Sequence, residues 1–167
     1  TGHATVVNAT QVTLVASSID GNLAATATTG DITQSGALTI TGTSTLITSA
    51  NDRTITLNDT SNAFTGALTI TTNDNSGTDA DVTIDGGTTA LIIAASTIDG
   101  DLTLTSGATA GITDSGTVTV LGDIYLITDA GNGVIDMGTL AVTGSVDLET
   151  NGSGDATLVN ATALNFM

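Results

Sequence analysis

The chain has 167 residues, and a single basic residue, Arg53, stands against 17 acidic residues, which gives a net charge of -16. Such a charge repels phosphate backbones, so we expect no binding to nucleic acid. Hydrophobic residues make up 40% of the sequence but aromatic residues only 2%, and there is no cysteine or proline. We therefore expect a core of Val, Ile, Leu and Ala in many thin, regular layers, with neither disulfides nor thiolate metal sites.

Taken in chain order, the sequence predicts short strands separated by turns. The run ATVVNAT at 4–10 is followed by SSIDGNL at 17–23 and by a longer stretch at 31–48. Within that stretch Leu38 and Ile40 alternate with threonine, the period-two pattern of a strand with one apolar face. Similar runs follow Gly36, Asp52 and Gly66, at nearly regular intervals. No comparable window has apolar residues at helical spacing, so crossover helices are not expected.

The second half of the chain repeats the first. SSIDGNL at 17–23 returns as STIDGDL at 96–102, the stretch 31–48 returns at 111–128, and TGALTITTN at 65–73 returns as TGSVDLETN at 143–151. The opening ATVVNAT also returns, as ATLVNAT at 156–162. The first three displacements are nearly equal, so the chain 1–167 is interpreted as one domain made of about two units, each of roughly 78–80 residues.

Such a repeat without helices predicts an all-β, single-domain parallel β-helix, or β-solenoid. Each coil of a solenoid buries its apolar face only against its neighbours, so equivalent positions stack and the sequence repeats. Parallel crossovers are generally right-handed, and we expect that hand here. The coil length stays open between about 20 and about 26 residues. The candidates for one stacked row are Leu38, Leu68, Leu102, Val118 and Val146.

Aspartates form two groups that would suit a hard cation. Asp79, Asp81 and Asp85 lie in GTDADVTID, and Asp99 and Asp101 lie in TIDGDL. Carboxylate oxygens are the ligands that Ca²⁺ prefers, so these five residues are candidate metal ligands and Ca²⁺ is the candidate cofactor. The alternative is that they bond the backbone of their own turns and keep the array soluble. The repeat GGxGxDxUx of calcium-binding β-helices is absent.

The residues needed for catalysis are scarce. The only histidine, His3, has no Ser or Cys nucleophile arranged with it. A polysaccharide-active β-helix enzyme would need paired catalytic groups in a groove and commonly aromatic side chains, whereas the only aromatic residues are Phe64, Tyr125 and Phe166. We therefore expect a protein that is not an enzyme and has no catalytic residues; polysaccharide chemistry is the least favoured alternative.

Threonine pairs indicate a further alternative. Thr39/Thr41, Thr43/Thr45, Thr103/Thr105 and Thr117/Thr119 form TxT patterns that resemble those of ice-binding solenoids. Outward threonine is also simply a favourable residue of a solvated strand.

Several runs resemble the β-strand repeats of filamentous-haemagglutinin-like adhesins and other very large bacterial surface proteins. They are GALTITGTSTLIT at 36–48, GDLTLTSGA at 100–108, NATQVTL at 8–14 and ATALNF at 161–166. The resemblance covers nearly the whole chain, and it implies a right-handed parallel β-helix that is exported to the cell surface. The family's N-terminal secretion-recognition region and a receptor-binding insertion are not recognisable in this sequence.

Two functions follow from these expectations. The first is a stalk or shaft segment of an extracellular surface protein, and the second is a subunit that assembles end to end. The runs at 4–10 and 156–166 both belong to the repeat pattern, so the repeat begins and ends without a distinct capping segment. Open strand edges of a solenoid pair with further chain. The expected partners are copies stacked head to tail, or the continuation of the same chain. The longest apolar run, 90–95, is too short to cross a bilayer, so no membrane insertion is expected.

Overall fold

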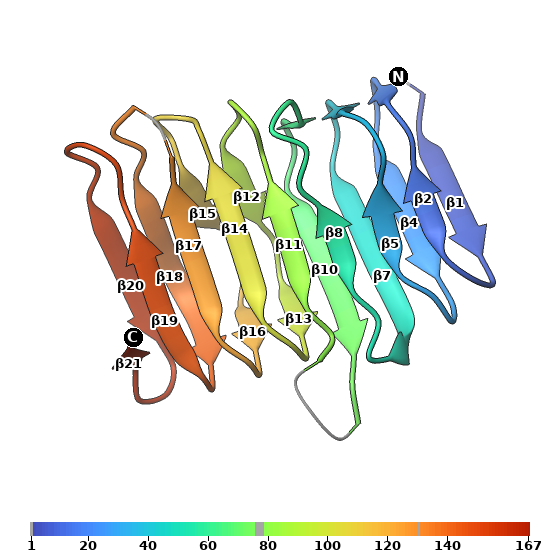
Figure 1. The fold of residues 1–167 in the computed structure, drawn as a ribbon. Helices are drawn as coiled ribbons and strands as arrows, with labels where there is room; N and C mark the ends of the chain where they lie inside the picture. Colours follow the sequence, from blue (N-terminus) through green and yellow to red (C-terminus); the bar gives the residue numbers. More distant parts are fainter. Residues whose placement is uncertain (1, 76–78, 130) are drawn as a thin grey trace.

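The computed structural model describes residues 2–75, 79–129 and 131–167 (Figure 1). These residues form short strands and no helix. The strands of the first half are β1 (Ala4–Asn8), β2 (Val12–Leu14), β3 (Ser17–Ile19), β4 (Leu23–Ala27), β5 (Ile32–Gln34), β6 (Leu38–Ile40), β7 (Ser44–Asn51), β8 (Ile55–Leu57), β9 (Ala63–Phe64) and β10 (Leu68–Asn73). Those of the second half are β11 (Val82–Asp85), β12 (Leu91–Ile93), β13 (Ser96–Ile98), β14 (Leu102–Ser106), β15 (Ile112–Asp114), β16 (Val118–Val120), β17 (Ile124–Thr128), β18 (Ile135–Val142), β19 (Ser145–Glu149), β20 (Ala156–Asn160) and β21 (Asn165–Phe166).

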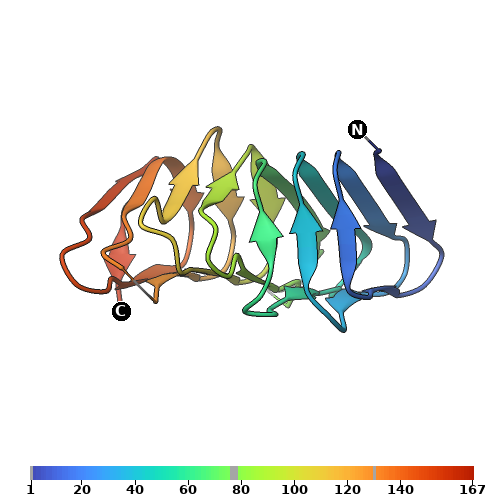
Figure 2. The same ribbon diagram turned by 90° about the horizontal axis from the view of Figure 1, so that it is seen from above.

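The strands stack in parallel into sheets that run the length of the molecule. An eight-stranded sheet has the order β2-β5-β8-β11-β14-β17-β19-β21, so seven turns of the chain separate its first strand from its last. A ten-stranded sheet includes β1, β4, β7 and β10 and continues through β12, β15 and β18. A three-stranded sheet, β3-β6-β9, closes one side of the first half (Figures 1 and 2). The predicted single-domain parallel β-solenoid is thus confirmed.

The length of a turn varies along the axis. Ala4 pairs with Leu23, so the first turn takes the chain from position 4 to position 23. Ile55 pairs with Val82, so a later turn takes it from position 55 to position 82. The first of these turns is shorter than the shorter coil that the sequence left open, and the second is longer than the longer one. Both coil lengths therefore fall within the observed range, and the longest turn is the one that carries the segment between β10 and β11.

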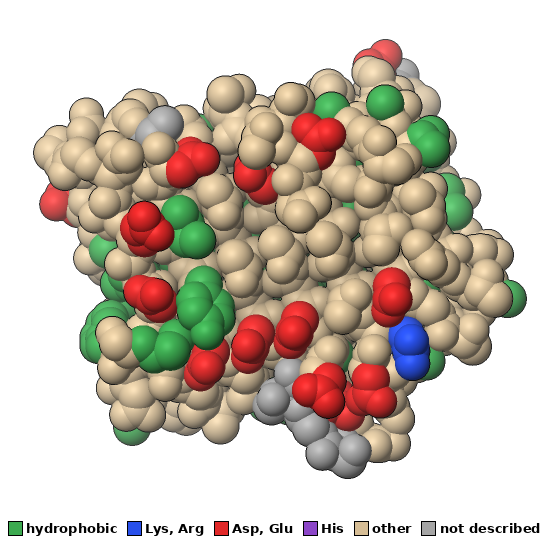
Figure 3. All heavy atoms as spheres, in the orientation of Figure 1, with side chains coloured by type: hydrophobic (Ala, Val, Ile, Leu, Met, Phe, Trp, Pro, Cys, Tyr) green, Lys and Arg blue, Asp and Glu red, His purple; other side chains and the backbone are tan. Residues whose placement is uncertain are grey.

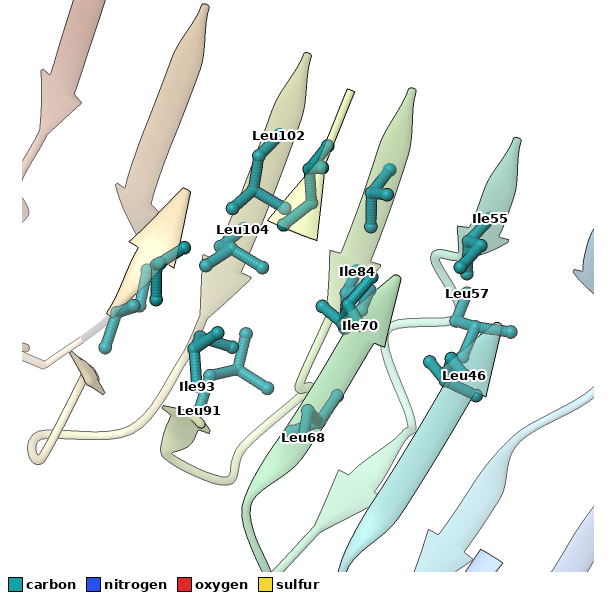
Figure 4. Packing of buried hydrophobic residues seen from close by; sticks show 14 of the residues in the cluster. Leu46, Ile55, Leu57, Leu68, Ile70, Ile84, Leu91, Ile93, Leu102 and Leu104 are labelled. Carbon is teal, nitrogen blue, oxygen red and sulfur yellow. The ribbon is translucent and has the colours of Figure 1, made fainter. Parts of the chain in front are cut away.

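The core is one continuous apolar cluster between the sheets. Inward side chains from facing strands point toward one another, as Ile84 and Ile70 do in Figure 4. Each inward side chain also stacks on its equivalent in the next turn. One such row in the eight-stranded sheet comprises Val12, Ile32, Ile55, Val82, Leu102, Ile124 and Val146, all buried. Burial of each such side chain contributes about 1.5–3 kcal/mol, so stability accumulates turn by turn.

The repeat unit is not a whole number of turns. Leu23 pairs with Ser44, Ser44 with Leu68, and Leu68 with Ile93, so three turns advance the chain from residue 23 to residue 93. The repeat counterpart of Leu23 is Leu102, which lies further along the chain, on β14 in the eight-stranded sheet. The strands β4 and β7 of the ten-stranded sheet therefore have counterparts, β14 and β17, in the other sheet. The second unit is turned by one side of the coil relative to the first.

The change of side between the two units occurs at β10. This strand pairs with β12 through Leu68 and Ile93, and with β13 through Thr71 and Thr97. Between these two pairings the hydroxyl of Ser96 accepts a hydrogen bond from the Ile70 N–H at 3.0 Å and donates one to the Ala94 carbonyl at 2.8 Å. The single strand β10 thus pairs with two shorter strands, β12 and β13, where the second unit begins to stack on the first.

The five residues predicted to form one row do not stack together. Leu38 lies on β6 in the three-stranded sheet, Leu68 and Val118 lie in the ten-stranded sheet, and Leu102 and Val146 lie in the eight-stranded sheet. Only Leu102 and Val146 share a row, with Ile124 between them. All five are buried. The prediction of their burial was correct and the prediction of a common row was wrong, because similar runs lie on different sides of the coil and the unit is not a whole number of turns.

Candidate functional surfaces

A glycine stands at the corner where the chain enters the long strand of most turns. A Cβ atom on Gly122 would lie within 3.0 Å of the backbone of Gly100, and one on Gly144 would lie equally close to Gly122. Gly42 and Gly66 are packed in the same way in the first unit. The glycines at this corner are therefore required because the backbones of successive coils touch there.

The residue after this glycine position often accepts a hydrogen bond from the next turn. Oδ1 of Asp81 accepts from the Asp101 N–H at 2.9 Å, Oδ1 of Asp101 from the Asp123 N–H at 2.7 Å, and Oδ1 of Asp123 from the Ser145 N–H at 2.6 Å. In the first unit, Nδ1 of His3 accepts from the Asn22 N–H at 2.9 Å, and Oδ1 of Asn22 accepts from the Thr43 N–H at 3.1 Å. His3 and Asn22 precede strands of the ten-stranded sheet, whereas Asp81, Asp101 and Asp123 precede strands of the eight-stranded sheet, so they form two separate rows in space. We call the five residues together the acceptor column.

This column accounts for two of the five predicted metal ligands and for the only histidine. Asp81, Asp101 and His3 each accept from a backbone N–H of the next coil, whereas the alternative interpretation had the aspartates bond the backbone of their own turns. Asn22 and Asp123 belong to the acceptor column but were not among the predicted site residues. Their signal is local, since each follows a glycine and precedes the first apolar residue of a strand.

Two more of the predicted ligands lie beside the segment that joins β10 to β11. Oδ2 of Asp99 accepts a hydrogen bond from the Asp74 N–H at 2.9 Å. A hydrogen bond with the side chain of Asp74 raises the pKa of Asp52. Burial and the negative charges of Asp74 and Asp79 raise this pKa further, and the positive charge of Arg53 lowers it. Figure 3 shows acidic side chains gathered on this face next to the basic one. The region is thus a crowded set of carboxylates, of which Asp52 and Asp79 are exposed and Asp74 and Asp99 are half-buried.

The fifth predicted ligand, Asp85, lies at another corner. It lines a surface hollow of about 240 Å³ together with Asp129, Thr60 and Thr88. Its Oδ1 accepts a hydrogen bond from the Gly87 N–H at 2.7 Å. Burial raises the pKa of Asp85, and the negative charges of Asp129 and Asp59 add to the effect.

The five aspartates are thus spread over three places. In the described part of the chain, no three His, Asp or Glu side chains come together as a group that could hold a metal ion. Calcium binding stays a prediction.

A column of threonines follows the outer face of the eight-stranded sheet. Thr13 pairs with Thr33, Thr33 with Thr56, Thr56 with Thr83 and Thr83 with Thr103. The hydroxyls of Thr13 and Thr33 are 3.2 Å apart, and Nε2 of Gln11 donates to both. The next two turns place Tyr125 and Asp147 in line with Thr103. Five consecutive turns therefore present hydroxyl and methyl groups in one line.

The chain matches the model of a family described as repeats of unknown function (DUF5649), over residues 1–71 and again over residues 79–137. Together the two matches cover more than half of the chain. The chain belongs to this family. Comparison with curated proteins and with solved structures gave no significant match.

The two DUF5649 matches agree with the repeat found in the sequence. The first begins at residue 1, just before β1, and the second begins at residue 79, just before β11. A DUF5649 repeat therefore starts on the ten-stranded sheet in the first unit and on the eight-stranded sheet in the second. The described part of the chain contains no helix long and apolar enough to span a membrane.

Proposed function

We propose that this DUF5649 chain is a length of a rigid, non-enzymatic solenoid that serves as a shaft or fibre at the outside of a bacterial cell. The observation that carries the proposal is the continuous apolar core. It passes through both repeat units although the second is turned by one side, so identical units can follow one another without a break in the core. Length and stiffness are the properties that such stacking supplies.

The surface supports the same proposal. Every acidic residue lies between residues 20 and 155, and the outward positions are dominated by Thr, Ser, Asn and Asp. Dense charge of one sign keeps long repeat arrays apart from one another. The cell-surface location rests on the resemblance to filamentous-haemagglutinin-like repeats given above.

The test of the shaft is the length of designed arrays. Chains of one, two, three and four units, built from residues 1–79 or multiples of them and closed by the last turn, are imaged by electron microscopy. Because a unit spans slightly more than three turns, each added unit should lengthen the rod by roughly 16 Å, at about 4.8 Å per turn. Rods that bend between units, or lengths that do not scale with unit number, would refute a rigid shaft. Digestion of intact cells by added protease tests the location.

A specific observation favours a second candidate, ice binding. The threonine column from Thr13 to Thr103 repeats hydroxyl and methyl groups at the spacing of parallel strands, about 4.8 Å. A thermal hysteresis assay tests whether the chain binds ice. Activity that is lost in Thr56→Tyr, at the centre of the column, would support this candidate, and no hysteresis in the native chain would remove it.

Calcium stabilisation is the remaining candidate. It predicts a higher melting temperature in Ca²⁺ than in chelator, through Asp79, Asp81, Asp85, Asp99 or Asp101. Identical melting in the two conditions would remove it.

A further inference from the structure

We infer that the free edge of β20 is a docking site for β1 of a second copy of this chain, in a parallel, head-to-tail and in-register contact. The inference rests on the proposed function, since it gives a rule for how shafts of this kind join. In the described residues β1 pairs only with β4, and β20 pairs only with β18. These two edges lie at opposite ends of the same ten-stranded sheet (Figure 1).

The two edge strands have nearly the same sequence. β1 reads ATVVN and β20 reads ATLVN. In the first turn Ala4 pairs with Leu23 and Val6 with Ala25, which places Ala4 and Val6 on the inward face. In the last turn Ala156 pairs with Ile135 and Leu158 with Met137, so Ala156 and Leu158 face inward likewise. Stacking β1 on β20 would place Ala4 on Ala156 and Val6 on Leu158, which continues both apolar rows.

Exposed apolar surface is concentrated in the first and last turns. The exposed large hydrophobic side chains are Val6, Val7, Val15, Leu121, Val159, Phe166 and Met167, and all but Leu121 lie in the first or last turn. Val7 is 69% exposed and Val159 is 57% exposed, and the proposed register sets them side by side. Docking would therefore remove apolar surface from water at both ends at once.

The two edge strands and their neighbouring segments carry no acidic residue. Although the chain carries a net charge of -16, residues 2–19 and 156–167 contain no Asp or Glu. Like-charge repulsion between copies is therefore weakest when one end meets the other. An unpaired strand edge that is flat, apolar and uncharged is the kind that adds another strand. Because the two contacting surfaces differ, the contact is heterologous and leaves both outer ends open for further copies.

The experiment uses the full chain and three variants. Sedimentation velocity of the native chain should show mass rising with concentration. Val7→Asp blocks one surface and Val159→Asp the other, so each variant alone should be monomeric, whereas an equimolar mixture should stop at a one-to-one dimer. Leu121→Asp is the matched control, since Leu121 is exposed but central, and it should assemble like the native chain. Circular dichroism establishes that each variant is folded.

The register has its own readout. Neighbouring parallel strands bring paired Cα atoms within disulfide range, and the chain contains no native cysteine. A mixture of Val7→Cys and Val159→Cys chains should therefore form a mixed disulfide under mild oxidation, and Thr5→Cys with Val159→Cys should not.

Three results would overturn the inference: a native chain that stays monomeric, dimers of Val7→Asp alone, or disruption by Leu121→Asp. A monomeric chain that nevertheless forms rigid rods of the expected length in the array experiment would leave the shaft proposal intact. The ends of such a chain would then be covered by something other than a second copy.

Discussion

The two repeat units close corners that are equivalent in sequence in different ways. In the first unit residues 58–61 separate Leu57 from Asn62, whereas in the second only Gly138 and Thr139 separate Met137 from Leu140. The shorter link lets β18 run on through the corner, and Leu140 pairs with Val118 as part of the strand. The longer link interrupts the strand, and the side chain of Asn62 enters the core in its place.

The side chain of Asn62 supplies hydrogen bonds to backbone groups of the neighbouring strands. It is 1% exposed, and its Oδ1 accepts from the Leu38 N–H and from Nε2 of Gln34, each at 2.9 Å. Its Nδ2 donates to Oε1 of Gln34 at 2.9 Å and to the carbonyls of Leu57 and Asp85 at 3.2 and 3.0 Å. The two corners together show that a solenoid tolerates insertions there, provided that the buried backbone groups of the neighbouring turns keep partners.

The largest effect is expected for Asn62→Leu, which introduces the residue of the second unit. It leaves the Leu38 N–H and two carbonyls buried without this partner, so we expect a loss of about 3–5 kcal/mol in the free energy of unfolding. Urea denaturation followed by circular dichroism measures it. Asn58→Leu, at an exposed position of the same link, is the control and should change little. Equal effects of the two variants would contradict the role given to Asn62.

The next effect concerns the glycine corner that both units share. Gly122→Ala forces a Cβ against the backbone of Gly100, and overpacking of this kind costs about 1–3 kcal/mol. Gly2→Ala is the matched control, since nothing lies within 4 Å of its Cβ position. We expect the melting temperature to fall for Gly122→Ala and to stay unchanged for Gly2→Ala; a comparable fall in both would remove the close approach as the reason for glycine.

The acceptor column differs between units in charge, with Asn22 in the first unit where Asp101 stands in the second. Asp101→Ala removes the acceptor of the Asp123 N–H and should cost about 1 kcal/mol. Asp101→Asn keeps an acceptor and lowers the net negative charge, so its stability should equal or exceed that of the native chain. If Asn is as damaging as Ala in urea denaturation, the carboxylate has a role other than accepting this bond.

One core position differs in polarity, since Ser44 of β7 has Ile124 of β17 as its counterpart. The Ser44 hydroxyl is fully buried and has no hydrogen-bond partner among the described residues. Ser44→Ala should therefore raise the free energy of unfolding by about 1 kcal/mol. Thr48→Val, which removes a buried hydroxyl that donates to the Arg53 carbonyl at 3.2 Å, should lower it. Shifts of the same sign in thermal melting would argue against this interpretation.

The smallest effect is the pH dependence contributed by Asp85, which joins the two units through its carbonyl bond to Asn62. Its pKa in the folded chain is raised above 3.8, mainly by burial, so the folded state holds the proton more tightly than the unfolded state. This contribution favours folding below pH 3.8 and is lost as the pH rises through the raised pKa. Asp85→Asn should therefore gain stability relative to the native chain as the pH rises, in denaturation series at several pH values. A difference that does not vary with pH would contradict the assignment.

The β-solenoid follows from the amino-acid sequence alone. Alternation such as Leu38-Thr39-Ile40 sets which side chains face inward, and the echo of SSIDGNL as STIDGDL requires stacked equivalent units, because each turn can bury its apolar face only on its neighbours. The regular occurrence of glycine before strands could also be recognised in the sequence. The folded chain supplies its reason, since contact between successive backbones leaves no room for a Cβ. From local pattern alone the aspartates could be interpreted either as metal ligands or as backbone acceptors.

Which residue lies above which in successive turns emerged only from the folded chain. A small difference in corner length, such as that between Leu57–Asn62 and Met137–Leu140, is invisible to a pattern of period two but accumulates along the chain. The unit therefore ends one side beyond three full turns, which separates Leu68 from Leu102. Backbone hydrogen bonds between positions a full turn apart fix the register, and a full turn varies from the Ala4–Leu23 spacing to the Ile55–Val82 spacing. The register at any one strand thus depends on every corner that precedes it.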